Sequence, residues 1–103
     1  MMPIRIQRKR VRGWRMPEGA VYVGRPSRFG NPYRVGFIYD IDDKPFVVHT
    51  RAQAVELYRR HLELHPLSAD DIAKLCGKDL ACFCPLDQPC HADVLLELAN
   101  PLD

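Results

Sequence analysis

A strand–loop–helix pattern near the end of the chain constrains the fold more than any other feature. Residues 79–84 (Asp-Leu-Ala-Cys-Phe-Cys) form a short apolar run that is typical of a buried strand. Residues 85–90 form a loop bounded by two prolines, which do not fit the interior of a strand or a helix. Apolar side chains at helical spacing then predict a helix from His91 to Ala99. This order predicts an α/β unit.

Caps and turns divide the rest of the chain into short elements. Thr50 and Ser68 are suited to capping the N-termini of two helices. The first helix should end near His65, ahead of Pro66, and the second at Gly77. The remaining predicted segments are a strand over 20–25, a loop over 26–33, and a hairpin of residues 33–39 and 45–49 around an acidic turn at 40–44. The sequence therefore predicts an α/β or α+β fold, a small mixed sheet with helices packed mainly on one side.

The length of 103 residues predicts a single domain. We expect a basic N-terminal arm over residues 1–11 and one α/β domain over residues 12–103. The 47% hydrophobic content is sufficient for a core of ordinary size. Folding should therefore not require a metal ion or a disulfide.

Positive charge is concentrated in the first third of the chain. The net charge of +2 is too small to indicate a nucleic-acid partner, but residues 1–34 contain a single acid, Glu18, and the remainder is acidic. This asymmetry fits a phosphate-bearing partner, because guanidinium groups match phosphate oxygens in pairs; it fits a solvated basic arm equally well. The basic residues of this region are Arg5, Arg8, Lys9, Arg10, Arg12, Arg15, Arg25, Arg28 and Arg34.

The sequence predicts a cytoplasmic protein that does not enter membranes. No apolar run approaches the roughly 18 residues that span a bilayer. The charged N-terminus is not followed by the apolar stretch of a secretory signal. Thiols stay reduced in the cytosol, so the four cysteines are expected to be ligands, nucleophiles or core residues instead of disulfide partners.

A cysteine–histidine cluster is the strongest candidate for a functional site. Cys82 and Cys84 share one face of the predicted strand, and Cys90 and His91 return at the start of the last helix. Thiolate sulfur and imidazole nitrogen are the ligands that zinc prefers in a tetrahedral site. The C-x-C and Cys-His spacings are not those of the common zinc knuckle, so the pattern indicates a special site more strongly than zinc itself. Cys76, by contrast, is expected to fill the core.

The same residues also suit a metal-free thiol enzyme. The helix dipole favours a thiolate at Cys90, so Cys90 or Cys84 can serve as the nucleophile with His91 as the base. Asp93 either orients His91 or stabilises the first turn of the helix. A third interpretation, which is strongest for Cys82, is that the cysteines are small core residues.

A polar loop follows the first predicted strand. Glycine permits close approach to a ligand, side-chain amides and hydroxyls donate hydrogen bonds, and arginine grips anions. The loop therefore predicts an anion site, although it matches neither a Walker loop nor a dinucleotide fingerprint. A rigid turn with exposed arginines is the alternative. The candidate ligand-binding residues are Arg25, Ser27, Arg28, Gly30 and Asn31.

Three motifs resemble those of a known family. They are Arg-Gly-Trp-Arg-Met-Pro from residue 12, Val-Gly-Arg-Pro-Ser-Arg-Phe-Gly-Asn-Pro at 23–32, and Gly-Lys-Asp-Leu-Ala-Cys-Phe-Cys-Pro-Leu-Asp-Gln-Pro-Cys-His-Ala-Asp at 77–93. Over residues 12–99 the chain is similar to the family called domain of unknown function 4326, small proteins of bacteria and their phages. The resemblance assigns no reaction. It implies that the loop and the cluster line one pocket, joining Arg25, Ser27, Gly30, Asn31 and Pro32 with Cys82, Cys84, Cys90, His91 and Asp93.

The leading hypothesis is a metal-binding domain, with zinc as the expected ion, whose pocket takes a nucleotide or another phosphate-bearing small molecule. If such a site is catalytic, with Cys90, His91 and Asp93 as the reacting groups, an open metal position would activate water. The alternatives are the metal-free thiol enzyme and a non-catalytic nucleic-acid-binding module. That module would use the basic first third and Trp14, whose other interpretation is a core anchor.

Overall fold

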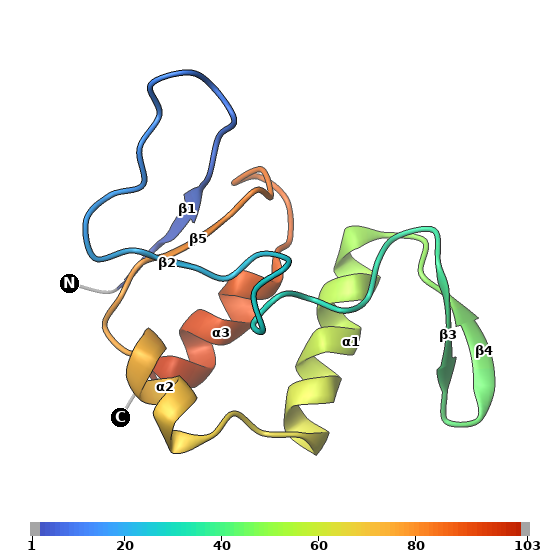
Figure 1. Cartoon of the computed structure of the whole chain (residues 1–103). Coiled ribbons are helices and arrows are strands. Elements are labelled where there is room, and N and C mark those ends of the chain that lie inside the picture. The colour runs from blue at the N-terminus through green and yellow to red at the C-terminus, as the bar shows by residue number, and fades with distance from the viewer. Residues whose placement is uncertain (1–2, 102–103) are drawn as a thin grey trace.

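A computed structural model describes residues 3–101 and has a three-stranded parallel sheet at its centre (Figure 1). The strands are β1 (Arg5–Gln7), β5 (Leu80–Cys82) and β2 (Val21–Tyr22), in the spatial order β1-β5-β2. Leu80 is opposite Arg5 on one side and Val21 on the other. The last strand in the sequence is therefore the middle strand of the sheet, and it ends at Cys82.

The described part of the chain contains three helices: α1 (Arg51–Leu64), α2 (Ala69–Leu75) and α3 (His91–Ala99). α3 packs against β1 and β5 and also against both other helices, so it connects the sheet to the rest of the molecule. All three residues of β5 are buried, as expected for a middle strand with helices over it. The core side chains include Val23, Tyr58, Leu62, Leu75, Leu80, Val94 and Leu95.

The predicted helix starts are confirmed, whereas α2 ends at Leu75, two residues before the predicted end at Gly77. Thr50 forms a capping box with Gln53, in which each side chain bonds the backbone of the other residue. Ser68 caps α2 through the backbone N–H of Asp71. α1 ends at Leu64, before Pro66, because the residue ahead of a proline is pushed out of the helical conformation.

The predicted hairpin forms, but its strands are β3 (Ile38–Ile41) and β4 (Lys44–Val47), so residues 40, 41 and 44 of the predicted turn lie in the strands. Asp42 and Asp43 form its two-residue turn with φ angles of 54° and 63°, the left-handed conformation that this turn requires. The hairpin stands away from the parallel sheet, on the far side of α1 (Figure 1). The α/β class is confirmed, while the parallel and antiparallel pairings lie in two separate sheets.

β1 lies within the segment that the sequence assigns to a basic arm. Its side chains alternate charged, apolar and polar, so the local pattern gives no strand signal, and pairing with β5 decides its conformation. The chain after β1 projects as a long loop from one end of the sheet before it returns as β2 (Figure 1). Among the described residues, the longest helices fall short of the length and apolarity needed to cross a membrane.

Candidate functional site

Three cysteines converge where β5 ends and α3 begins. Cys82 is the last residue of β5, Cys84 lies two residues further along, and Cys90 is the N-cap of α3. Their sulfur atoms all lie within 4.8 Å of one another, and the Sγ atoms of Cys82 and Cys90 are 2.9 Å apart. Cys82 and Cys90 are buried and Cys84 is half-buried. This group of three thiols can hold a metal ion.

His91 presents one ring nitrogen to this cluster and anchors the other. Its Nε2 lies 2.7 Å from the backbone carbonyl oxygen of Val23, which can only accept, so Nε2 carries a proton. Its Nδ1 lies 3.6 Å from the Sγ of Cys90. The ring is buried and stands perpendicular to the ring of Tyr58, with 5.4 Å between the centroids. When the ring carries its single proton on Nε2, the lone pair of Nδ1 is turned toward the Cys90 sulfur.

The crowding of the three thiols separates their pKa values. Hydrogen bonds from the thiols of Cys82 and Cys90, with the positive charges of Arg51 and Arg5, lower the pKa of Cys84 to about 3. Hydrogen bonding to the Cys84 sulfur and burial raise the pKa of Cys82 far above the ordinary range for a thiol. A thiolate at Cys84 beside a protonated thiol at Cys82 is therefore the expected charge state at neutral pH.

Arg5 and Asp93 occupy the outer side of the cluster. The nearly buried guanidinium of Arg5 donates to the carbonyl oxygen of Leu86 at 2.7 Å and so ties β1 to the loop between the cysteines. Its Nη1 is 3.6 Å from the Asp93 carboxylate and is buried without a hydrogen-bond partner among the described residues. The orienting role predicted for Asp93 is wrong, since His91 contacts Val23 and Cys90 instead. Asp93 is a first-turn acid of α3, as its alternative interpretation states.

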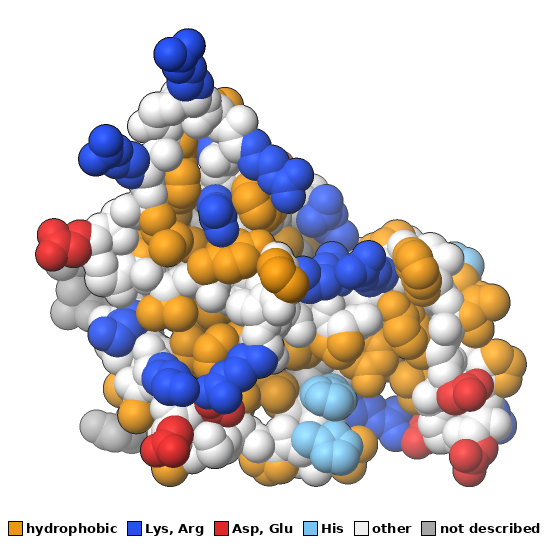
Figure 2. Space-filling model, in the orientation of Figure 1, with side chains coloured by type: hydrophobic (Ala, Val, Ile, Leu, Met, Phe, Trp, Pro, Cys, Tyr) orange, Lys and Arg blue, Asp and Glu red, His pale blue; other side chains and the backbone are white. Residues whose placement is uncertain are grey.

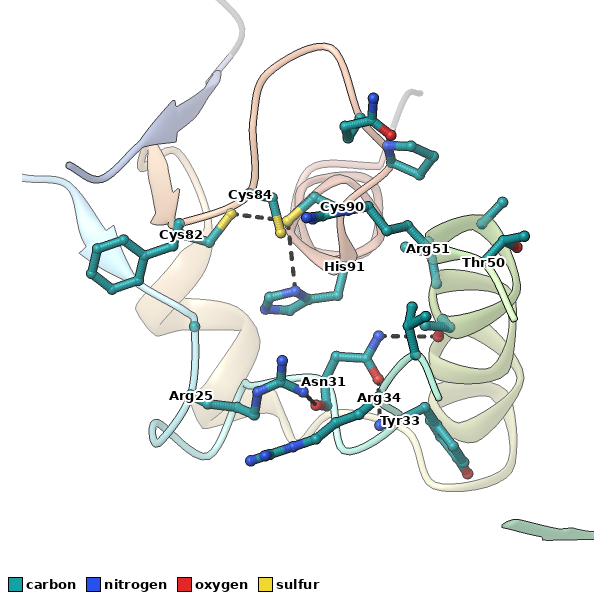
Figure 3. Close-up of a pocket in the computed structure, with 18 of the residues that line it drawn as sticks. Arg25, Asn31, Tyr33, Arg34, Thr50, Arg51, Cys82, Cys84, Cys90 and His91 are labelled. Carbon is teal, nitrogen blue, oxygen red and sulfur yellow. Dashed lines mark hydrogen bonds between the residues drawn. The ribbon is translucent and has the colours of Figure 1, made fainter. Parts of the chain in front are cut away.

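A pocket of about 1000 Å³ opens beside the cysteines (Figure 3). The cysteines and His91 lie along one side, and residues of the loop after β2 lie opposite, with the N-terminus of α1 at one end. The loop and the cluster therefore line one pocket. Within residues 3–101 no aspartate or glutamate lines it. Its charged lining consists of Arg10, Arg25, Arg34 and Arg51.

Asn31 and Arg25 line the pocket but also hold the loop in place. The buried amide of Asn31 donates to the Ala54 carbonyl oxygen in α1 at 3.0 Å and accepts from the Tyr33 backbone N–H at 2.9 Å. Arg25 donates to the carbonyl oxygen of Asn31 at 2.8 Å. The Asn31 side chain is therefore occupied by structural hydrogen bonds, whereas Arg25 keeps further N–H groups for a ligand.

The other three predicted ligand-binding residues do not line the pocket. Arg28 points away and pairs with Asp71 of α2. Gly30 serves packing, since a Cβ atom there would lie 2.9 Å from the Arg25 side chain. The hydroxyl of Ser27 is buried and has no hydrogen-bond partner among the described residues. The glycine, serine and second arginine of the loop thus shape its turn instead of facing the cavity.

Arg34, Arg51 and Arg10 are site residues that the sequence does not single out. The sequence does carry a local signal that Arg51 has a role other than helix stability. Arg51 is the first residue of α1, where a positive charge opposes the helix dipole and where no acid in the first turn offsets it. Arg34 and Arg10 have no such signal, because they reach the pocket from irregular segments. Cys76, expected in the core, is exposed, because α2 ends at Leu75, its last buried position.

Comparison with known proteins agrees with the motifs of the loop and the cluster. The model of the family described as "Domain of unknown function (DUF4326)" matches residues 6–101. The chain belongs to this family. The matched DUF4326 region includes every residue of the pocket lining and the cysteine cluster. No curated protein and no solved structure matches the chain.

Proposed function

We propose that this DUF4326 protein is a cytoplasmic zinc protein whose basic pocket binds a phosphate-bearing ligand such as a nucleotide. The convergence of three sulfur atoms within 4.8 Å carries the metal half of the proposal. Zinc–sulfur bonds of about 2.3 Å in a tetrahedron place neighbouring sulfurs roughly 3.8 Å apart, which small side-chain rotations of Cys82, Cys84 and Cys90 would reach. We assign His91 as the fourth ligand because its Nδ1 lies 3.6 Å from the Cys90 sulfur, although His91 is not part of the group whose atoms all lie within 4.8 Å of one another.

The donor set favours zinc among the common metals. Thiolate sulfur and imidazole suit zinc, whereas magnesium and calcium require oxygen ligands. Two further contacts support His91 as a ligand: the bond from its Nε2 to the Val23 carbonyl holds the ring, and the Tyr58 ring packs against it. With four protein ligands the site is closed and structural.

The composition of the pocket lining supports a phosphate-bearing ligand. Four arginines line the cavity, and none of the described carboxylates does. The electrostatic potential in the cavity therefore favours anions. Arg34 and Arg51 form no ion pair within residues 3–101, and their N–H groups are free to grip phosphate oxygens in pairs. Apolar and aromatic side chains complete the lining and suit the flat part of a nucleotide: Tyr22, Tyr33, Val35, Phe37 and Val55.

Metal analysis of protein purified without a histidine tag tests the first half. We expect about one equivalent of zinc in the wild type and loss of most of it in Cys84→Ser and Cys90→Ser. Cys76→Ser is the matched control, because this exposed thiol lies outside the cluster and its removal should leave the zinc content unchanged. Less than about half an equivalent of any transition metal, with all four thiols freely titratable, contradicts the proposal and favours the thiol enzyme.

Calorimetric titration with a nucleoside diphosphate tests the second half. We expect Arg51→Gln to weaken binding about tenfold, as for the loss of one charged hydrogen-bonding group. Arg60→Gln is the control on the same helix, because Arg60 pairs with Asp42 and does not line the pocket. An equal loss of affinity in the two variants, or no binding of the nucleoside diphosphate by the wild type, would contradict the proposal that the pocket binds phosphate.

A further inference from the structure

The arginines of this chain fall into two sets. Four of them each contact a carboxylate: Arg5, Arg28, Arg59 and Arg60 pair with Asp93, Asp71, Glu97 and Asp42. Within residues 3–101 the remaining arginines have no acidic partner, and they come from the loop after β1 and from the pocket. This second set, here called the unpaired arginines, consists of Arg8, Arg10, Arg12, Arg15, Arg25, Arg34 and Arg51.

Two of the unpaired arginines stack on aromatic rings. The guanidinium carbon of Arg8 lies 4.6 Å from the ring centroid of Tyr22, and that of Arg10 lies 4.3 Å from the centroid of Phe83. The two rings meet edge to face, with 6.0 Å between their centroids. A guanidinium stacked on a ring is held in position while the N–H groups at its edge stay free for an anion.

The unpaired arginines extend from the pocket to the projecting loop. A second, shallower hollow of about 400 Å³ lies beside the main pocket and shares Arg10, Tyr22, Arg25 and Phe83 with it. Arg8 and Lys9 add to the lining of this hollow, and Arg12 and Arg15 continue along the exposed loop. Figure 2 shows basic side chains from the tip of the projecting loop down to the middle of the molecule, with the visible acids at the margins. The positive surface therefore extends well beyond the pocket.

We propose that this surface binds a single-stranded nucleic acid, one nucleotide of which enters the pocket beside the cysteine cluster. The inference rests on the phosphate site proposed above and names its ligand class. A mononucleotide would leave Arg12 and Arg15 without a role, whereas a polynucleotide backbone meets both. Arginines interleaved with the aromatic rings Tyr22 and Phe83 are the combination that binds single strands, since bases stack while phosphates meet the cations. A concave pocket admits one splayed base more readily than a duplex.

Fluorescence anisotropy with labelled DNA and RNA single strands of about 12 nucleotides tests this proposal on the full zinc-loaded chain. We expect binding that weakens steeply with salt. The double variant Arg12→Gln/Arg15→Gln should lose about tenfold in affinity. The slope of the logarithm of its binding constant against the logarithm of the salt concentration should be shallower by about 1.4, the value for two lost phosphate contacts. Arg59→Gln/Arg60→Gln removes the same charge from the acid-paired set and should lose less than about twofold.

Several outcomes would overturn the proposal. They are an unchanged affinity of Arg12→Gln/Arg15→Gln for the oligonucleotide, an equal loss in both double variants, tighter binding of a blunt duplex, and equally tight binding of phosphatidylglycerol vesicles. The zinc content and the nucleoside diphosphate titration of Arg12→Gln/Arg15→Gln identify which proposal fails. Normal values for both, with no effect on the oligonucleotide, reject the nucleic-acid surface alone. A wild type without zinc and without nucleoside diphosphate binding rejects the proposed function itself.

Discussion

At the scale of single residues, the cluster is defined by how its side chains share protons and charge. Cys82 and Cys90 place their sulfur atoms next to that of the half-buried Cys84, and Arg5 and Arg51 supply positive charge. The first proton therefore leaves this group far more readily than it leaves free cysteine. A deprotonated sulfur is also what a metal ion binds, so the cluster is prepared for ligation before any metal arrives.

Alkylation of the metal-free protein should be nearly independent of pH between about pH 6 and pH 8 at Cys84. Its pKa of about 3 keeps the thiolate fully populated, whereas free cysteine, with a pKa of about 8.5, loses roughly tenfold in rate per pH unit on acidification. Because the folded pKa is depressed, the thiolate stabilises the fold fully above about pH 8.5 and progressively less as the pH falls toward 3. Iodoacetamide kinetics by mass spectrometry, with Cys84→Ser as the control, measure this; a tenfold drop per unit contradicts it.

Replacement of Arg5 by glutamine should destabilise the protein by roughly 2 kcal/mol, because it removes a charged donor from the carbonyl oxygen of Leu86. The loop between Cys84 and Cys90 depends on that bond for its place. Urea unfolding followed by circular dichroism measures the loss. Lys78→Gln is an exposed control that should change stability by less than about 0.5 kcal/mol.

At the scale of elements, the N-terminus of α1 connects stability to the site. Thr50 and Gln53 satisfy the first backbone N–H groups of the helix, and Thr50 and Arg51 line the pocket. Asn31 and Tyr58 hold the loop after β2 against the same helix, through the carbonyl oxygens of Ala54 and Phe29. The helix therefore carries one wall of the pocket and also anchors the wall opposite the cysteines.

Thr50→Ala should cost about 1 kcal/mol of unfolding free energy, since the alanine cannot accept the hydrogen bond from the Gln53 backbone N–H. Thr50→Ser retains the hydroxyl and should keep most of that stability. Thermal unfolding of the two variants measures the difference. An equally large loss in Thr50→Ser would assign the effect to the methyl group instead of the cap.

At the scale of the whole molecule, the cluster lies at the junction of a strand and a helix that are held together by strand pairing and side-chain packing. β5 is paired on both sides, and α3 packs on the sheet and on both other helices. The cysteines connect the end of this middle strand to the start of α3. The hairpin of β3 and β4 lies outside that core. Val35 and Phe37, from the segment just before β3, line the pocket.

Removal of the metal with a chelator should lower the melting temperature without unfolding the protein. The proposed zinc ion would contribute its binding free energy to the folded state, whereas the apolar core should persist when the ion is removed. Far-ultraviolet circular dichroism at room temperature should be unchanged, and the melting temperature should recover when zinc is added back. Loss of the dichroism signal on chelation would mean that folding depends on the metal.

Local signals in the sequence determine most of the elements and the centre of the site. Thr50, Ser68 and the prolines set the helix boundaries. Strand β5 ends at Cys82, so Cys84 lies beyond it, but the two-residue spacing still keeps both sulfurs close together. These predictions succeed because a cap, a turn or a strand face depends only on residues a few positions apart. The sequence alone therefore predicts the three cysteines of the site.

Tertiary structure alone decides the partners of the charged residues and the pairing of the short strands. β1 is a strand only because β5 offers it an edge, and Asp93 meets Arg5 instead of His91 because the sheet brings β1 alongside α3. Arg28 pairs with Asp71, while Arg34 and Arg51 face the pocket. Each of these choices joins segments far apart in the sequence, and a flexible charged side chain carries no local pattern that reveals its partner.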